Sequence, residues 1–251
     1  MDKSTAARAA ALLLQARATG NWLATLPDEL SPVTESDAYA VQDVVMAEIG
    51  PVGGWKVGAK GIAAQPNCAP LAQSLIFPEG AALPPGLLRL RGVEAEIGFK
   101  LAQDLPPRAQ PYAIEEVADY IESVHPTLEI VESRYIDFRQ VAQFSVLADS
   151  NSNGALIVGA PIAVQTRDAY SALSVSLKFN GMEKCTATCG NPAQDLLRLL
   201  AWLANHCTER CGGLRKGQVV TTGSHTGMLF AEAGTGVSAE FAGLGGVSIS
   251  L

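Results

Sequence analysis

Two glutamates stand close together in the stretch of residues 92–101, where apolar residues alternate with polar residues or glycine. Strict alternation is typical of a half-buried β-strand, and it places Glu94 and Glu96 side by side on the face opposite the apolar one. Because neighbouring carboxylates repel each other, either water screens them on an open surface or a cation lies between them. Antiparallel strands often carry glutamate on a solvated face, so the pair alone leaves both explanations open.

A third acid, Glu129, lies within the apolar, β-branched run of residues 126–131, which predicts a second strand. A carboxylate in such a run is costly to bury unless it is paired or bound to a metal. This third acid therefore favours a cation site over a merely solvated pair.

Four short motifs follow one another along the chain: GWKVG at residues 54–58, VEAEI at 93–97, LEIVESR at 128–134 and ADSNS at 148–152. In this order they resemble the bacterial 2-keto-4-pentenoate hydratases and their sister 4-oxalocrotonate decarboxylases, of the fumarylacetoacetate hydrolase superfamily. The resemblance implies an enzyme that uses Mg²⁺ or Mn²⁺, held by Glu94, Glu96 and Glu129. Three carboxylates without histidine or cysteine suit these hard ions and argue against Zn²⁺ or copper. The coordination positions left open would accept water and a 2-oxo acid.

The resemblance also implies catalytic roles for Lys56, Glu79 and Ser152. A lysine ammonium beside the metal would compensate the negative charge and stabilise an enolate. Glu79 stands where the family carries an acid that transfers protons, although the family pattern has aspartate there. Ser152 matches a position that holds the substrate or an attacking water, but a serine in such a cluster is equally typical of a turn.

Three further residues are candidates for binding the substrate. Thr222 ends a predicted strand in a loop that the family folds over the substrate. His225 departs from the family pattern and would alter acid–base chemistry or substrate length selection; without such a role, a lone loop histidine is expected to be exposed. Arg134, or Arg139, could provide a second cation for the distal carboxylate of a dicarboxylic substrate.

These assignments predict a hydratase that adds water to 2-hydroxypenta-2,4-dienoate, or a close analogue, and releases a 4-hydroxy-2-oxo acid in aromatic catabolism. One alternative is a metal-dependent decarboxylase of 4-oxalocrotonate-like acids. A second is a catalytically silent partner subunit of such an enzyme. Sequence alone leaves the three open, because it does not show which way the arginines point.

Composition excludes several other functions. The chain has 251 residues, 48% of them hydrophobic, and a formal net charge of −7. Without a cluster of lysine and arginine, nucleic-acid binding is not expected. No apolar run approaches the roughly 20 residues of a membrane helix, so we expect a cytoplasmic protein that does not contact membranes. The pairs Cys185–Cys189 and Cys207–Cys211 are spaced by four, which argues against a zinc knuckle and favours free thiols.

Helices and strands follow in an order typical of an α+β protein. Ser4 would cap a first helix to Thr19, a Thr34–Asp37 capping box a second that ends before Pro51, and Asn191 a third. Predicted strands cover residues 55–57, 74–77, 87–91, 93–101, 127–133, 155–158, 173–180, 218–222, 236–241 and 247–251. We therefore expect a helical segment at 1–50 and a catalytic β-rich domain at 51–251. The resemblance further implies a mixed, rolled β-sandwich core, and a homo-oligomer.

Overall fold

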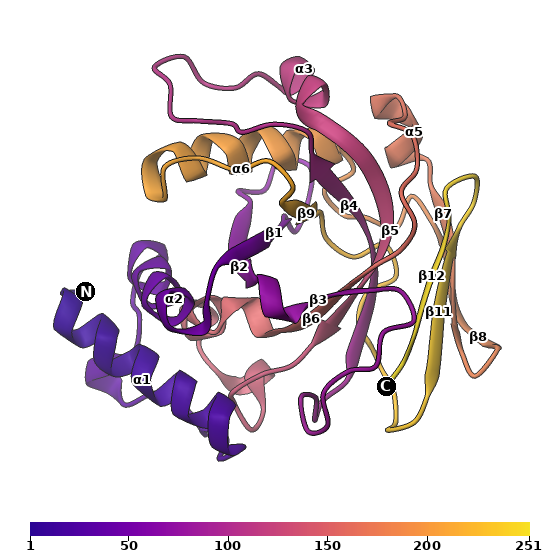
Figure 1. Ribbon diagram of the computed structural model, residues 1–251. Coiled ribbons are helices and arrows are strands. Elements are labelled where there is room, and N and C mark those ends of the chain that lie inside the picture. The colour runs from indigo at the N-terminus through magenta and orange to yellow at the C-terminus, as the bar shows by residue number, and fades with distance from the viewer.

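The computed structural model describes residues 1–251, and its strands form two β-sheets, a larger one in the middle of the molecule and a smaller one at its right edge in Figure 1. The larger sheet has eight strands in the order β2-β1-β9-β4-β5-β6-β3, with β10 paired to β4; the smaller has the order β12-β11-β7-β8. The strands of the larger sheet are β1 (Val52–Gly58), β2 (Asn67–Ala72), β3 (Ile76–Pro78), β4 (Gly92–Leu101), β5 (Ile121–Val131), β6 (Asn153–Val158), β9 (Val219–Thr221) and β10 (Leu229–Phe230). Those of the smaller are β7 (Ser174–Phe179), β8 (Met182–Thr188), β11 (Gly236–Phe241) and β12 (Gly245–Ser250).

Six α-helices accompany the sheets, so the protein has an α+β architecture. They are α1 (Lys3–Thr19), α2 (Glu35–Ile49), α3 (Ile114–Val117), α4 (Gln143–Ala148), α5 (Arg167–Ser171) and α6 (Leu196–Arg210). In Figure 1, α1 and α2 lie together at one side of the larger sheet, and α6 lies near β1 and β9. No helix combines the length and the apolar composition that crossing a membrane demands.

Local signals explain where the main helices begin. The predicted capping box is confirmed: the Thr34 hydroxyl accepts from Asp37 N at 3.1 Å, and the Asp37 carboxylate accepts from Thr34 N at 3.0 Å. The first helix is capped by Asp2, whose carboxylate accepts from Thr5 N at 2.7 Å, and not by Ser4. The third predicted helix corresponds to α6. It begins later than predicted, because its cap is Asp195, whose carboxylate accepts from Arg198 N at 3.1 Å, and not Asn191.

Two strand predictions also need correction. Residues 87–91 form no strand, because the backbone N–H groups of Arg89 and Leu90 donate to the Glu132 carboxylate and not to a neighbouring strand. None of the predicted strands covers β8, β10 or β2, and β2 contains Pro70. This strand lies at the edge of the larger sheet, where a residue without a backbone N–H is tolerated.

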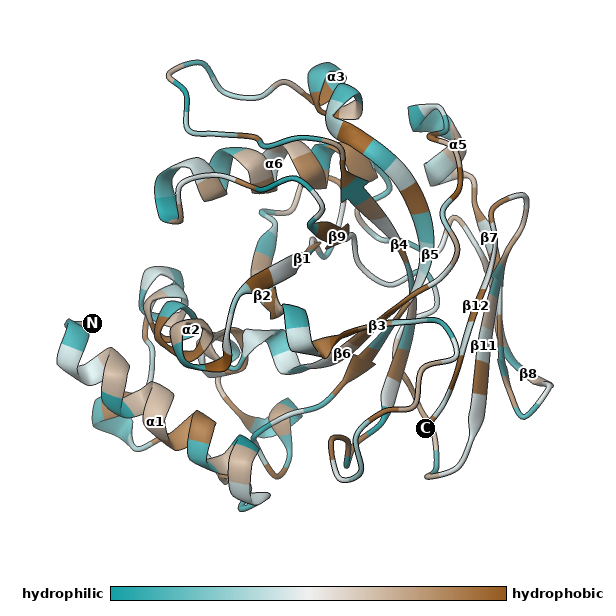
Figure 2. Ribbon diagram, viewed as in Figure 1, coloured by the Kyte–Doolittle hydropathy of each residue, from teal (hydrophilic) through white to brown (hydrophobic).

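Burial divides the larger sheet into two different faces. On β4, the alternate residues Val93, Ala95 and Ile97 belong to the main apolar core, which also includes residues of the N-terminal helices, α6 and the smaller sheet. The opposite face carries Glu94, Glu96, Glu129 and Lys56, together with a separate small cluster of Leu71, Leu156 and Val219. Figure 2 shows a continuous apolar stretch on β6 and alternating apolar and polar residues on β5, whereas the outer strand β8 is mostly hydrophilic. The predicted alternation thus separates the core from a second, partly polar interior face.

Candidate active site

The antiparallel pairing of β4 and β5 brings the three predicted carboxylates together. Glu94 is the register partner of Glu129, and Glu96 lies two residues further along the same face of β4. One oxygen from each carboxylate lies within 4.8 Å of the others. Glu94 is half-buried, while Glu96 and Glu129 are only 2% and 1% exposed. This group of three carboxylates is called the glutamate cluster below.

Burial makes the glutamate cluster unfavourable without a cation. Loss of hydration, with the charge of Glu129 added, raises the pKa of Glu94 to about 7 and that of Glu96 to about 8. Like charges in a poorly hydrated site therefore favour protonation of the acids. A bound cation would replace those protons and remove the repulsion.

Lys56 is the cation that the structure itself provides. It lies on β1, which pairs with β9, and β9 in turn pairs with β4. From there its ammonium forms an ion pair with the Glu129 carboxylate and donates to Asn151 O at 3.0 Å. Burial by itself would lower the pKa of Lys56, but the charges of the three glutamates outweigh burial and raise it, so the side chain stays positive. One ammonium against three carboxylates leaves two negative charges when all are ionised.

The donor set fits a divalent metal ion. Glu129 Oε2 is buried and has no hydrogen-bond partner, although Oε1 accepts from Lys56 and Asn153. A buried carboxylate oxygen without a partner is costly, and a metal ion would satisfy it. The ligand atoms offered are all carboxylate oxygens, which suit Mg²⁺ or Mn²⁺. The two uncompensated charges match those of such an ion.

Side chains that sequence reasoning missed support the glutamate cluster. Thr221 Oγ1 donates to Glu96 Oε2, and Gly223 N donates to the same oxygen at 2.9 Å. Asn153 Nδ2 donates to Glu129 Oε1 at 3.2 Å. Both side chains are direct neighbours of residues that were predicted, Thr222 and Ser152. Strand alternation across residues 219–222 was the signal that could have selected Thr221 over Thr222.

Thr222 and His225 follow β9 and are both buried. Thr222 Oγ1 donates to Ile97 O at 2.7 Å, so its hydroxyl ties the loop to β4. His225 is 2% exposed, so the expectation of an exposed loop histidine is wrong. Its ring packs edge-on against Phe241 with 5.5 Å between the centroids, and neither ring nitrogen has a hydrogen-bond partner. Burial lowers the pKa of His225 to about 4, which keeps the imidazole neutral near pH 7.

Ser152 lies in a tight turn between α4 and β6. Ser150, Asn151 and Ser152 all adopt left-handed backbone conformations, with φ of 52°, 49° and 58°. Such conformations are unfavourable for residues other than glycine, so surrounding contacts must hold the turn. The Ser152 hydroxyl is buried without a hydrogen-bond partner, while Asn151 O accepts from Lys56. The turn therefore carries one polar group that is bonded to Lys56, the carbonyl of Asn151, and one that has no partner, the hydroxyl of Ser152.

Arg134 supplies much of the support for this turn. Its guanidinium forms an ion pair with the Asp149 carboxylate and donates to Asp149 O at 2.7 Å and to Asn153 O at 2.8 Å. The side chain is 2% exposed, and no hydrogen bond or ion pair joins it to the glutamate cluster. Arg134 thus acts on the two ends of the turn that carries Asn151 and Ser152.

Glu79 and Arg139 are not brought to the glutamate cluster. Glu79 follows β3, is exposed, and accepts from Ser248 Oγ at 2.9 Å. Arg139 is exposed and pairs with Asp137 at 3.0 Å. Neither side chain has a hydrogen bond or ion pair to Glu94, Glu96 or Glu129. Neither Arg134 nor Arg139, therefore, places a free guanidinium beside the cluster.

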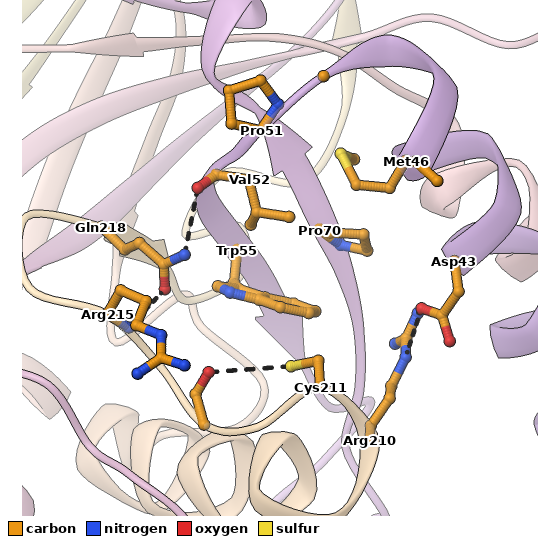
Figure 3. Close-up of a pocket in the computed structure, with 13 residues that line it drawn as sticks. Asp43, Met46, Pro51, Val52, Trp55, Pro70, Arg210, Cys211, Arg215 and Gln218 are labelled. Atoms are coloured by element: carbon orange, nitrogen blue, oxygen red, sulfur yellow. Dashed lines mark hydrogen bonds and ion pairs between the residues drawn. The ribbon is translucent and has the colours of Figure 1, made fainter.

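A separate cavity of about 570 Å³ lies between α2, β1 and the end of α6. Figure 3 shows Trp55 in its interior and Arg210 turned toward Asp43. None of the predicted site residues lines it. Because Trp55 and Lys56 are consecutive on β1, their side chains point to opposite faces of the strand, and the cavity is distinct from the glutamate cluster.

Comparisons with known proteins identify relatives of this chain. The sequence profile of the fumarylacetoacetate (FAA) hydrolase C-terminal family matches residues 64–250. The chain is 31% identical to 2-keto-4-pentenoate hydratase 1 of Dechloromonas aromatica (strain RCB), over 96% of this chain and 94% of the relative. It is 29% identical to a 4-oxalocrotonate decarboxylase of a Pseudomonas species, over 63% of this chain and 59% of the relative.

A solved structure shares the fold over the whole chain. The 4-oxalocrotonate decarboxylase from Pseudomonas putida G7, complexed with magnesium and adipate, superposes with a TM-score of 0.86. The alignment covers 100% of this chain and 98% of that chain, at 24% sequence identity.

Proposed function

This chain belongs to the fumarylacetoacetate hydrolase family, and we propose that it is a metal-dependent hydratase that acts on 2-hydroxypenta-2,4-dienoate or a close analogue in aromatic meta-cleavage catabolism. The product is a 4-hydroxy-2-oxo acid. The observation that carries the proposal is the glutamate cluster with Lys56 ion-paired to it. Relatives named 2-keto-4-pentenoate hydratase give this site its reaction class.

Glu94, Glu96 and Glu129 would hold the metal ion, Mg²⁺ or Mn²⁺. When bound there, such an ion supplies Lewis-acid polarisation of the 2-oxo group of the substrate. Thr221 and Gly223 fix the orientation of Glu96, and Asn153 with Lys56 fixes that of Glu129. Hydrogen bonds of this kind keep ligand carboxylates in place and strengthen metal binding.

The overall reaction has two balanced parts. First, the enol proton leaves the C2 hydroxyl and a proton is added at C5, which gives the 2-oxo-3-ene. Water then adds across the remaining double bond, with hydroxyl at C4 and hydrogen at C3. Lys56 Nζ, which stays protonated, stabilises the negative charge that develops on the C2 oxygen during both parts.

The remaining site residues keep proposed roles. The unbonded hydroxyl of Ser152 is suited to hold the substrate or the attacking water. Neutral His225 and the loop of Thr222 would contact the substrate beside β9. Arg134 acts as a positioning residue through the turn. The role of Glu79 as the acid for C5 stays a prediction, because its exposed carboxylate is bonded to Ser248 in this structure.

Decarboxylation of a 4-oxalocrotonate-like acid is the second candidate, favoured by the 29% identity to a decarboxylase. That reaction needs a cation for the distal carboxylate, and no hydrogen bond or ion pair joins the guanidinium of Arg134 or Arg139 to the glutamate cluster. A catalytically silent partner subunit is the third candidate. The glutamate cluster together with Lys56 makes it the weakest of the three.

One experiment separates these candidates. Purified protein is incubated with Mg²⁺ and either 2-hydroxypenta-2,4-dienoate or 4-oxalocrotonate, while diene absorbance and CO₂ are followed. Loss of absorbance with the first substrate and no CO₂ with the second supports the hydratase. Release of CO₂ supports the decarboxylase, and no turnover of either overturns both.

The same proposal includes four general features of the protein: the shape of the larger sheet, the division of the chain, the oligomeric state and the cellular location. The larger sheet is rolled over the site, which the contact of Leu71 on β2 with Leu156 on β6 and Val219 on β9 supports. Residues 1–50 form a helical segment and 51–251 a catalytic domain. A homo-oligomeric state and a cytoplasmic location stay predictions.

A further inference from the structure

A second, smaller cavity lies at the C-terminal end of α1, away from the glutamate cluster. Its volume is about 240 Å³, and its lining includes Arg17, Trp22, Glu132, Arg134 and Gly154. Gly154 follows Asn153 on β6, and consecutive residues of a strand face opposite sides of the sheet. Because Asn153 points to Glu129, the cavity lies on the other side of β6 from the catalytic residues.

Positive charge exceeds negative charge around this cavity. The Asp149 carboxylate has its own ion pair with Arg134, and Glu132 lies 3.8 Å from Arg89 Nε. The Glu132 carboxylate also accepts from three backbone N–H groups, those of Arg89, Leu90 and Ser133. Both nearby carboxylates are therefore already compensated.

Arg17 is the guanidinium left over. It is half-buried and forms no hydrogen bond or ion pair with any protein group. The neighbouring positive charge of Arg134, with burial added, lowers the pKa of Arg17 to about 9, and the carboxylates of Asp149 and Glu132 offset only part of this shift. The C-terminal carbonyl groups of α1 favour one cation in its last turn, but they do not compensate two guanidinium groups that lie near each other.

Both arginines have N–H groups that no protein acceptor binds. A guanidinium carries five N–H donors, and Arg134 uses three of its nitrogens on Asp149 and Asn153 with one bond each. Two of its N–H groups are thus without a protein acceptor, as are all five of Arg17. An anion between the two arginines would accept from both and remove their repulsion.

We propose that this cavity binds a small oxyanion, a carboxylate or a phosphate, between Arg17 and Arg134. The volume lies below the roughly 300 Å³ at which pockets for drug-sized ligands begin, so the ligand is inorganic phosphate or a short organic acid. Trp22 forms one wall, and Arg89 stacks on its ring at 4.7 Å. The site shares Arg134 with the turn that carries Ser152, but the proposal does not rest on the hydratase activity.

The test is a binding titration of the full-length protein at low ionic strength, where screening is weakest. Inorganic phosphate and acetate are titrated in separate arms, with calorimetry and tryptophan fluorescence as readouts. The variant is Arg17→Gln. The matched control is Arg8→Gln, which removes the same charge from the exposed part of the same helix, where Arg8 lies 3.8 Å from Glu29.

We expect saturable binding of at least one anion by the unaltered protein, unchanged affinity in Arg8→Gln, and affinity lower by about tenfold or more in Arg17→Gln. The arm that saturates identifies a tetrahedral or a planar anion. Equal loss in both variants would show non-specific charge attraction and overturn the site, as would the absence of saturable binding in both arms.

A second measurement checks the Arg17→Gln variant itself. Without anion, the melting temperature of this variant should equal or exceed that of the unaltered protein, because one of two repelling guanidinium groups is gone. A clearly lower melting temperature would mean that Arg17 has a protein partner, and would contradict the proposal.

Discussion

Glu94 on β4 and Glu129 on β5 are register partners in an antiparallel pair, and both carboxylates project from the same face. Two acids opposite each other on neighbouring strands repel, which destabilises a sheet unless a cation lies between them. In this protein Lys56 provides one positive charge at that point, and its ion pair is with Glu129. The remaining negative charge is the physical reason to expect that a divalent cation stabilises this protein.

Replacing Glu96 by glutamine should stabilise the metal-free protein and remove its response to Mg²⁺. Because the folded state raises the pKa of Glu96 to about 8, from an ordinary value of 4.5, the folded protein binds more protons than the unfolded chain between these pH values. Stability of the metal-free protein therefore falls as pH rises through this window, and Glu96→Gln reduces that loss. We expect a gain of on the order of 1–3 kcal/mol at pH 8.

Melting curves at pH 5 and pH 8, with and without Mg²⁺, check this prediction. The control is Glu122→Gln, on the exposed part of β5, where the carboxylate pairs with Lys100 at 2.9 Å. Only Glu96→Gln should lose both the stabilisation by Mg²⁺ and the turnover. A Glu96→Gln protein that is still stabilised by Mg²⁺ to the same extent would contradict the assignment of this ligand.

Thr221 and Thr222 should differ sharply although they are neighbours. Thr221 donates to the Glu96 carboxylate, so Thr221→Val should weaken Mg²⁺ binding by roughly 10–100-fold, the usual effect of removing a hydrogen bond to a metal ligand. Thr222 donates to Ile97 O, so Thr222→Val should cost about 1 kcal/mol of stability and leave Mg²⁺ affinity nearly unchanged. Calorimetric titration with Mg²⁺ distinguishes them, and equal losses of affinity would refute the distinction.

Replacing Lys56 by glutamine should leave Glu129 as a buried carboxylate without its cation. Removing one partner of a buried ion pair typically costs about 3–5 kcal/mol, so the metal-free variant should unfold at a lower denaturant concentration. Mg²⁺ should restore part of that stability but not the turnover, since the charge on the C2 oxygen loses its ammonium. Denaturation with and without Mg²⁺, together with the hydratase assay, tests both parts; full activity of the variant would exclude a catalytic role.

His225 should make the protein less stable in acid. Its pKa falls from an ordinary 6.5 to about 4 on folding, so the unfolded chain binds the proton more readily between these values. The free energy of unfolding is therefore highest above pH 6.5, where the ring is neutral in both states. It decreases as the pH falls toward 4, by up to about 3 kcal/mol. His225→Leu should narrow the difference in melting temperature between pH 7 and pH 5. An unchanged difference would mean that the ring is not desolvated.

The local sequence pattern by itself determined the face of β4 that carries the glutamates and the start of α2. Alternation across β4 placed Glu94 and Glu96 on one face, because side chains of a strand alternate whatever surrounds it. The capping box fixed the start of α2 because its hydrogen bonds join residues only three positions apart. The family motifs then gave Glu129 and Lys56, whose chemistry suits a hard cation.

Tertiary structure decided which of the other candidates reach that site. Strand order alone made Thr221 a partner of Glu96, placed the ammonium of Lys56 on Glu129, and left Glu79 on the surface. It also buried His225 and turned Arg134 onto Asp149. These contacts join residues far apart in the chain, so they depend on sheet register and burial, which short-range patterns do not encode.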